Sequence, residues 1–272
     1  MEKPFTLALG QMAVVVGQAE CNAATAWGMA AQAAAASVEL LLLPELWGHG
    51  YDLVHARRYA TTVDAGLFAE MAAMAKAYGL WVGGSLLGLR DADQTTPPFN
   101  LFALFRPDGS LAARYAKLHR FRLMDEDRFL AAGDEIALVD HAGARLGVAI
   151  CYDLRFPELF RRYASHQTTL MLLPAQWPRP RLAHWRTLLR ARAIENQMFV
   201  AACNRVGRDP NGTDFFGHSA IIDPWGETVV EGDDQPALLT ATIDLSLIDE
   251  VRRRLPVWDD RCPEMYGLKE RR

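Results

Sequence analysis

Short, nearly continuous apolar runs recur along the chain, separated by segments of mixed polarity. Strands that are covered on both faces have this unbroken pattern, whereas strands with one wet face alternate apolar and polar residues. The runs predicted as buried strands are 5–14, 38–45, 80–89, 146–153, 168–176 and 198–206. Between several of them, apolar residues at three- and four-residue steps predict helices over 23–39, 66–79 and 181–197.

A β-hairpin is predicted over 99–117, where two apolar runs flank the turn sequence Pro107-Asp108-Gly109. Strands that alternate with helices, together with one hairpin, indicate a layered α/β fold. No Gly-, Ser- or Pro-rich linker and no block of charge divides the 272 residues. We therefore expect residues 1–272 to form a single domain.

Composition narrows the class of protein. The formal net charge is -4 and the pI is near 6.0, without the basic face by which proteins usually bind nucleic acid, so a small molecule is the expected partner. No window approaches the ~20 apolar residues of a membrane span, so no membrane association is expected. The four cysteines form no C-x-x-C pair and are expected to be free thiols in a reducing compartment, which predicts a cytoplasmic protein.

Three predicted strands end in a polar or reactive residue that a turn follows. These residues are Glu45, Cys151 and the pair Gln176 and Trp177. In α/β sheets, ligands gather at the carboxyl ends of strands. A strand that stops at Cys151 and turns into the helix indicated by "FPELFRRYA" would hold the sulfur on a tight turn near backbone N–H groups, which suits a nucleophile.

A cysteine nucleophile needs a partner, because a thiol near its ordinary pKa of ~8.5 is mostly protonated at neutral pH. Histidine is the usual base, and His119 and His184 are candidates although neither follows a predicted strand. The alternative is a carboxylate base with a lysine. Glu45 would then take the thiol proton, and Lys117 would supply positive charge where an oxyanion develops.

Three motifs, in order along the chain, resemble those of the nitrilase superfamily of carbon–nitrogen hydrolases. "LLLLPELWGHGY" is similar to the glutamate motif, "RYAKLHRF" to the lysine motif and "GVAICYDLRFPELFR" to the cysteine motif. The resemblance continues through "PAQWPRPRLAHWRTLLRARAIENQMFVAACNRVG" and "GHSAIIDPWGE", so it covers nearly the whole chain. It implies a four-layer α-β-β-α sandwich, a homodimer, and the catalytic set Glu45, Lys117 and Cys151, with no metal and no organic cofactor.

The segment "MDEDRFLAAGDE" is similar to the family segment that carries a second acidic residue between the lysine and cysteine motifs. This resemblance implies a fourth catalytic position at Glu126. Its implied role is to position the substrate or to tune Lys117 by charge.

The resemblance also implies an amide hydrolase that works through a thioester on Cys151, with the oxyanion held by Lys117 and the backbone N–H of Tyr152. The stretch beginning "PAQWPRPRLAHW" is similar to the omega-amidase branch, which cleaves the terminal amide of keto-acid amides such as 2-oxoglutaramate. Such a substrate needs a cation for its far carboxylate. Arg155 is the nearest candidate in sequence, although a pairing with Glu158 that braces the turn is an equal alternative.

Several alternatives stay open at this level. Trp177 either lines a pocket or fills the core. A nitrile or an N-carbamoyl substrate would use the same three residues, so the motifs do not separate these substrates. A non-catalytic binding protein with this fold would be expected to have lost one of the three, and a zinc hydrolase would need clustered ligands. Cys21, Cys203 and Cys262 are interpreted as inert thiols.

Overall fold

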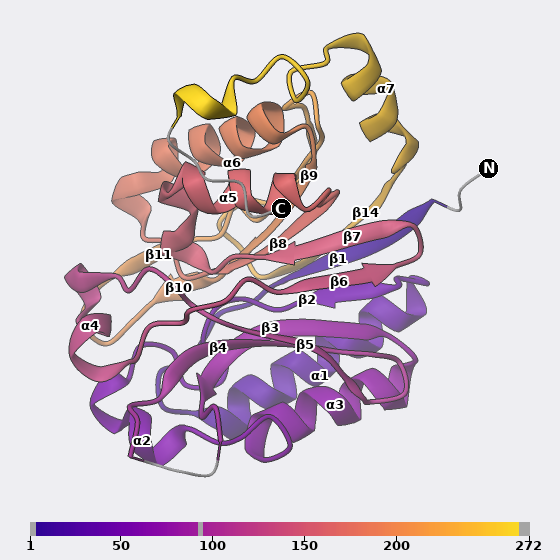
Figure 1. Cartoon of the computed structure of the whole chain (residues 1–272). Helices are drawn as coiled ribbons and strands as arrows, with labels where there is room; N and C mark the ends of the chain where they lie inside the picture. Colours follow the sequence, from indigo (N-terminus) through magenta and orange to yellow (C-terminus); the bar gives the residue numbers. More distant parts are fainter. Residues whose placement is uncertain (1–3, 92–94, 267–272) are drawn as a thin grey trace.

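Two six-stranded β-sheets lie against each other between two outer layers of helices in the computed structural model, which describes residues 4–91 and 95–266 (Figure 1). Helices α1 (Ala19–Ala35) and α3 (Gly66–Tyr78) cover the first sheet, and α5 (Pro157–Ser165) and α6 (Leu182–Asn196) cover the second. This arrangement confirms the predicted α/β fold, a four-layer α-β-β-α sandwich. The organisation of residues 1–272 as a single domain stays a prediction.

The first sheet has the strand order β14-β1-β2-β3-β4-β5. Its strands are β1 (Phe5–Gln11), β2 (Leu40–Leu42), β3 (Trp81–Gly88), β4 (Phe99–Phe105), β5 (Leu111–Ala116) and β14 (Ala237–Ile243). β1, β2 and β3 are parallel, and the other neighbours are antiparallel. β4 and β5 form the predicted hairpin, whose turn contains Gly109 at a φ of 84°.

The second sheet has the order β13-β12-β9-β8-β7-β6 and a parallel centre of β7, β8 and β9. Its strands are β6 (Leu138–His141), β7 (Ala144–Val148), β8 (Leu170–Ala175), β9 (Phe199–Asn204), β12 (Ala220–Ile222) and β13 (Thr228–Glu231). A separate two-stranded ribbon joins β10 (Val206–Arg208) to β11 (Asp214–Phe216).

Shorter elements complete the chain. They are the helices α2 (Ala56–Tyr59), α4 (Glu126–Phe129) and α7 (Ser246–Arg254), and the 3-10 turns η1 (Leu53–His55), η2 (Arg122–Met124), η3 (Cys151–Arg155), η4 (Arg179–Arg181) and η5 (Pro263–Met265). Within the described ranges, no helix combines the length and the apolar content needed to cross a membrane.

Helix α1 lies four residues earlier than the sequence pattern predicts for residues 23–39. The helix ends at Ala35 because Ser37 takes a left-handed φ of 55°, which α-helices do not continue through. Glu39 then donates its backbone N–H to Thr6 at the start of β1 and so already belongs to the sheet. The alanine-rich pattern therefore predicted that a helix is present, but not where it begins and ends.

Strand β2 is buried on both faces, and this burial fixes the position of the residues that follow the strand. Leu40 and Leu42 pack into the core between the two sheets, and Leu41 and Leu43 pack into the core under α1 and α3. Successive strand residues point to opposite faces, so both faces of this segment are covered. Burial of each leucine contributes about 2 kcal/mol, which anchors the chain just before Glu45.

Candidate active site

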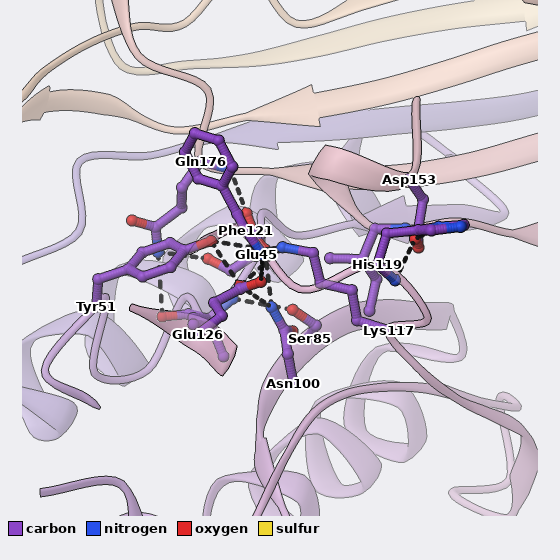
Figure 2. A network of polar contacts seen from close by, with 12 residues as sticks. Glu45, Tyr51, Ser85, Asn100, Lys117, His119, Phe121, Glu126, Asp153 and Gln176 are labelled. Carbon is purple, nitrogen blue, oxygen red and sulfur yellow. Dashed lines mark hydrogen bonds and ion pairs between the residues drawn. The ribbon is translucent and has the colours of Figure 1, made fainter. Parts of the chain in front are cut away.

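Glu45 stands beyond the carboxyl end of β2, as predicted, and its side chain is fully buried. The next residue, Leu46, has a φ of 43°, and its N–H donates to the Ser85 hydroxyl of β3 at 3.0 Å. A left-handed non-glycine residue costs on the order of 1 kcal/mol or more, so the surrounding structure must hold it. Beyond this sharp turn, the Glu45 carboxylate lies among the side chains of Lys117 and Asn100 (Figure 2).

Lys117 directly follows β5 and reaches the same point from the hairpin. Its backbone N–H donates to the Asn100 carbonyl at 3.0 Å, which continues the β4–β5 pairing by one residue. Its ammonium donates to Glu45 Oε1 and to Glu126 Oε1, each at 2.7 Å. Burial acts to lower the pKa of Lys117, but the negative charges of Glu126 and Glu45 outweigh it and raise that pKa, so the ammonium stays charged.

Glu126 is the first residue of α4, and its carboxylate is also completely buried. Its Oε2 accepts the Phe121 backbone N–H at 2.6 Å, while its Oε1 accepts from Lys117. Burial raises the pKa of Glu126; Lys117 opposes the shift and the charge of Glu45 adds to it. Two carboxylates around one ammonium leave a net negative charge when both are ionised.

Cys151 begins η3, three residues after Val148 makes the last strand pairing of β7, so the strand does not run to Cys151 as the sequence pattern predicted. Its φ of 45° marks a sharp turn on a buried residue. Asp153 holds this turn: its Oδ2 accepts the Ile150 N–H at 2.9 Å and the Tyr115 hydroxyl at 2.7 Å. The sulfur therefore sits on a rigid corner, as the sequence interpretation required, although η3 rather than the strand end forms that corner.

Cys151 lies close enough to Glu45 and Lys117 for their charges to shift the pKa of its thiol. Burial raises the pKa of the Cys151 thiol well above its usual range; the charge of Glu45 and a hydrogen bond with its carboxylate add to the shift, and Lys117 opposes it. These effects favour the thiol over the thiolate. We expect this sulfur to need a base in order to act as a nucleophile, and Glu45 lies near enough for its charge to act on the thiol.

Gln176, at the end of β8, links the second sheet to Glu45 (Figure 2). Its backbone N–H donates to Glu45 Oε2 at 2.8 Å, and its side-chain amide donates to the Glu45 carbonyl at 2.7 Å. The amide oxygen of Gln176 in turn accepts from the buried guanidinium of Arg205 at 3.1 Å. The two sheets are thus joined at the carboxylate itself, which fixes the orientation of the Glu45 side chain.

A pocket reaches Cys151 from outside, and all three predicted substrate-binding residues line it: Tyr152, Arg155 and Trp177. Trp177 also fills the core, because it is 2% exposed and its indole N–H donates to the Arg181 carbonyl at 3.1 Å. Both readings of Trp177 therefore hold. Arg155 lies against the Trp177 ring at 4.7 Å from its centroid and contacts His184 Nδ1 at 3.3 Å.

The proposed brace between Arg155 and Glu158 is not formed. In the described residues the recorded contacts of Arg155 are with His184 and Trp177, and α5 carries Glu158 in its first turn instead. Helix N-termini favour acidic side chains, which accounts for Glu158 without an arginine partner.

The sequence analysis missed two polar side chains of the cluster. The Tyr51 hydroxyl lies 3.0 Å from Glu45 Oε1 and 2.9 Å from Glu126 Oε1, and the Asn100 amide donates to Glu45 Oε1 at 2.7 Å (Figure 2). Tyr51 closes the quoted stretch "LLLLPELWGHGY", and Asn100 is the one polar side chain in the buried strand "FNLFALF". A buried amide in a strand that is otherwise apolar was the available signal.

Tyr51→Phe is expected to lower kcat by about 10- to 100-fold with little change in KM, because the ring is kept and one hydrogen bond to a carboxylate is lost. The hydroxyl favours ionised carboxylates, so its loss should also move the acidic limb of the kcat/KM profile to higher pH. Tyr59→Phe is the matched control, since that hydroxyl bonds Asp52 at 2.8 Å away from the cluster. Steady-state kinetics measured across pH test this role. It would be contradicted if Tyr51→Phe and Tyr59→Phe had the same kcat and the same pH profile.

The two histidine candidates have other partners. His119 Nδ1 lies 2.7 Å from Asp153 Oδ1, and its ring stacks on Phe156 at 3.6 Å, while His184 contacts Arg155. His119 thereby helps hold the turn at Cys151 through Asp153. Across the described ranges, no group of three or more His, Cys, Asp or Glu side chains is placed to hold a metal ion.

The similarity of the chain to known proteins agrees with this geometry. Residues 6–253 match the Carbon-nitrogen hydrolase family. The chain is 40% identical over 229 residues to the 2-oxoglutaramate amidase of Bacillus subtilis (strain 168), covering 84% of this chain and 86% of the relative. It is 29% identical over 273 residues to Omega-amidase NIT2 of Homo sapiens, covering 97% and 98%.

Solved structures give the same result. The crystal structure of a CN-hydrolase superfamily protein from Xanthomonas campestris, which has an arsenic adduct in its active site, superposes with a TM-score of 0.88 at 32% identity, covering 96% of this chain and 98% of that one. The matched region includes the segments of all three motifs recognised in the sequence. The chain therefore belongs to the carbon-nitrogen hydrolase family.

Proposed function

We propose that the protein is a thiol-dependent amidohydrolase that cleaves the terminal amide of a small carboxylate-bearing substrate of the 2-oxoglutaramate or 2-oxosuccinamate type, giving the acid and ammonia. The observation that carries this proposal is the buried ion pair of Glu45 with Lys117 at 2.7 Å, which lies close enough to Cys151 for both charges to act on its thiol. A thiol, a nearby carboxylate base and a fixed cation are the three groups that attack on an amide requires.

In the first half of the proposed reaction, Glu45 takes the thiol proton as the Cys151 sulfur attacks the amide carbon. The C–S bond forms and the carbonyl π electrons move to oxygen, which becomes an oxyanion. Glu45 then returns the proton to the amide nitrogen, the C–N bond breaks, and ammonia leaves a thioester on Cys151. The raised pKa of the thiol supports a base that acts during attack rather than beforehand.

In the second half, Glu45 takes a proton from water as the water oxygen attacks the thioester carbon. Collapse of this second oxyanion breaks the C–S bond, and the proton returns to sulfur. The acid is released and the thiol is restored. The sum is amide plus water giving acid plus ammonia, so this sequence uses no cofactor or metal.

Lys117 and the backbone N–H of Tyr152 are the proposed oxyanion donors. An ammonium has three N–H groups, and in the described part of the structure Lys117 gives two of them to Glu45 and Glu126, which leaves the third for substrate. Removal of one such preorganised donor typically costs about 10²–10³ in kcat. Glu126 serves in this proposal as the group that places Lys117 and keeps it charged.

The substrate class rests on the pocket and on the named relatives. Arg155 lines the pocket with Cys151 and offers a cation for a distal carboxylate. Binding of that distal carboxylate would hold the substrate so that its amide is oriented toward the sulfur. The relatives named 2-oxoglutaramate amidase and Omega-amidase NIT2 favour the same class over nitriles and N-carbamoyl amino acids.

The test is a comparison of kcat/KM for four substrates: 2-oxoglutaramate, a neutral amide of similar length, a simple nitrile and an N-carbamoyl amino acid. We expect 2-oxoglutaramate to exceed each of the others by at least about 10-fold, the value of one charge-assisted hydrogen bond. If the neutral amide or the nitrile reacts as well as 2-oxoglutaramate, the omega-amidase proposal fails and only the amide-hydrolase chemistry remains.

The cellular setting and assembly are also proposals. All four cysteines are free, and two of them, Cys21 and Cys262, are exposed, which supports a reducing compartment such as the cytoplasm. A homodimer is proposed from the family resemblance. Size-exclusion chromatography with light scattering tests the homodimer, and a mass near that of one 30.3 kDa chain would contradict it.

A further inference from the structure

A second arginine lines the same pocket as Arg155 and Cys151. Arg181 ends η4, just before α6, and its guanidinium lies 5.7 Å from the centroid of the Phe121 ring. Arg155 approaches the pocket from η3, and its guanidinium lies over the Trp177 ring. The Arg181 carbonyl accepts the Trp177 indole N–H at 3.1 Å, which ties the backbone of η4 to the wall of the pocket.

The arginines of η3, η4 and α6 differ in how their charges are neutralised. Arg179 pairs with Asp214, Arg186 with Glu231 at 2.7 Å and Arg192 with Glu195 at 2.9 Å. Among the described residues, the recorded side-chain partners of Arg155 and Arg181 are instead aromatic faces and the His184 ring. A guanidinium that lies on an aromatic ring keeps its N–H edge available for a carboxylate.

The charges of the two guanidinium groups also interact with each other. Burial lowers the pKa of Arg155, and the positive charge of Arg181 lowers it further. Two neighbouring cations at a pocket wall repel, and a bound anion removes that repulsion. This arrangement therefore favours a pocket with an anion in it over an empty pocket.

We propose that Arg155 and Arg181 together bind the 2-oxo-carboxylate end of the substrate, and that Arg181 is the residue that selects 2-oxo acids over amino acids with the same terminal amide. This inference rests on the proposed function. A 2-oxo-carboxylate presents a carboxylate and an adjacent carbonyl oxygen, all acceptors, which suit two donor forks. Glutamine presents a carboxylate beside an ammonium, and two cations repel that ammonium.

The test compares Arg181→Met with wild type on 2-oxoglutaramate, glutamine and a neutral amide of similar length. For Arg181→Met, the kcat/KM ratio of 2-oxoglutaramate to neutral amide is expected to fall about 10- to 100-fold, mainly through KM, because a charge-assisted contact is lost. The ratio of 2-oxoglutaramate to glutamine is expected to fall as well, because repulsion of the ammonium is relieved. Arg181→Lys, which keeps the charge, should restore part of both ratios.

Arg179→Met is the matched control, since Arg179 lies two residues away and is already paired with Asp214. It should leave both ratios near those of wild type. Equal ratios in Arg181→Met and wild type would overturn the proposal, as would an equal loss of activity on all three substrates, which would make Arg181 a structural residue. A wild-type enzyme that does not prefer 2-oxoglutaramate to the neutral amide would instead refute the proposed function itself.

Discussion

Replacing Cys151 with alanine is expected to lower kcat for amide hydrolysis by at least about 10⁴-fold while leaving the fold intact. Loss of a nucleophile removes the covalent route entirely, and what remains is binding and the oxyanion donors. Alanine fits the space of a side chain that is 4% exposed, and the turn is held by Asp153 and not by the sulfur. Ammonia release and thermal unfolding of the soluble variant measure the two effects separately.

Cys203→Ala is the matched control for this experiment. Cys203 is as buried as Cys151, and burial also raises the pKa of its thiol, but it lies within β9. Its replacement should leave kcat near wild type. If Cys203→Ala lost activity and Cys151→Ala kept it, the assignment of the nucleophile would be wrong.

A mass measurement on enzyme with an intact Cys151 adds direct evidence. Rapid quenching during turnover should trap a substrate-derived acyl group on Cys151, because hydrolysis of an amide by a thiol passes through a thioester. The exposed Cys21 and Cys262 are best replaced with serine beforehand, so that stray labelling does not obscure the result. An acyl group found on Cys203 would contradict the mechanism.

The sequence predicted those parts of the fold that depend on local pattern. Continuous apolar runs place β2, β7, β8 and β9, because strands covered on both faces need apolar residues at every position. The helix predicted over 66–79 is confirmed as α3, which ends where Gly79 takes a left-handed φ of 66°. The residues Glu45, Lys117 and Cys151 follow from ordered motifs, and the structure brings their side chains together.

The remaining parts of the site depend on contacts that no local pattern encodes. Gln176 and Glu45 lie 131 residues apart and meet only when the two sheets stack. Tyr51 is 75 residues from Glu126, and its hydroxyl reaches both carboxylates because the loop after β2 folds back over α4. Arg181 reads as one of many surface arginines in the sequence until its place beside Cys151 is known.

The turn at Cys151 is a second feature that the local sequence pattern did not predict. An apolar run that reaches "AIC" reads as a strand that ends at the cysteine, yet pairing of β7 stops at Val148 and Cys151 takes a φ of 45°. Positive φ at a non-glycine residue has no sequence signature, because its cost is offset by distant groups such as Tyr115 on Asp153. Contacts from the surrounding structure, not local preference, hold a cysteine in that conformation.

Glu45→Gln is expected to reduce kcat/KM by about 10³-fold or more although the side chain keeps its size, because an amide cannot accept the thiol proton. The carboxylate accepts from Lys117 and Asn100 at Oε1, both at 2.7 Å, and from the Gln176 N–H at Oε2. An amide has one oxygen for these two sets of donors, so its NH₂ must face a donor on one side. A modest drop in thermal stability should therefore accompany the loss of activity.

The choice between a carboxylate base and a histidine base rests on comparing Glu45→Gln with His119→Ala and His184→Ala. His119 acts on the site through Asp153, and His184 acts through Arg155, so neither histidine replacement removes the base in this mechanism. Both should retain far more kcat/KM than Glu45→Gln, and His184→Ala should act mainly through KM. Retained activity in Glu45→Gln together with its loss in either histidine variant would replace the carboxylate mechanism with a cysteine–histidine pair. Such a result would also require a large rearrangement, because Lys117 holds the Glu45 carboxylate in place near the thiol.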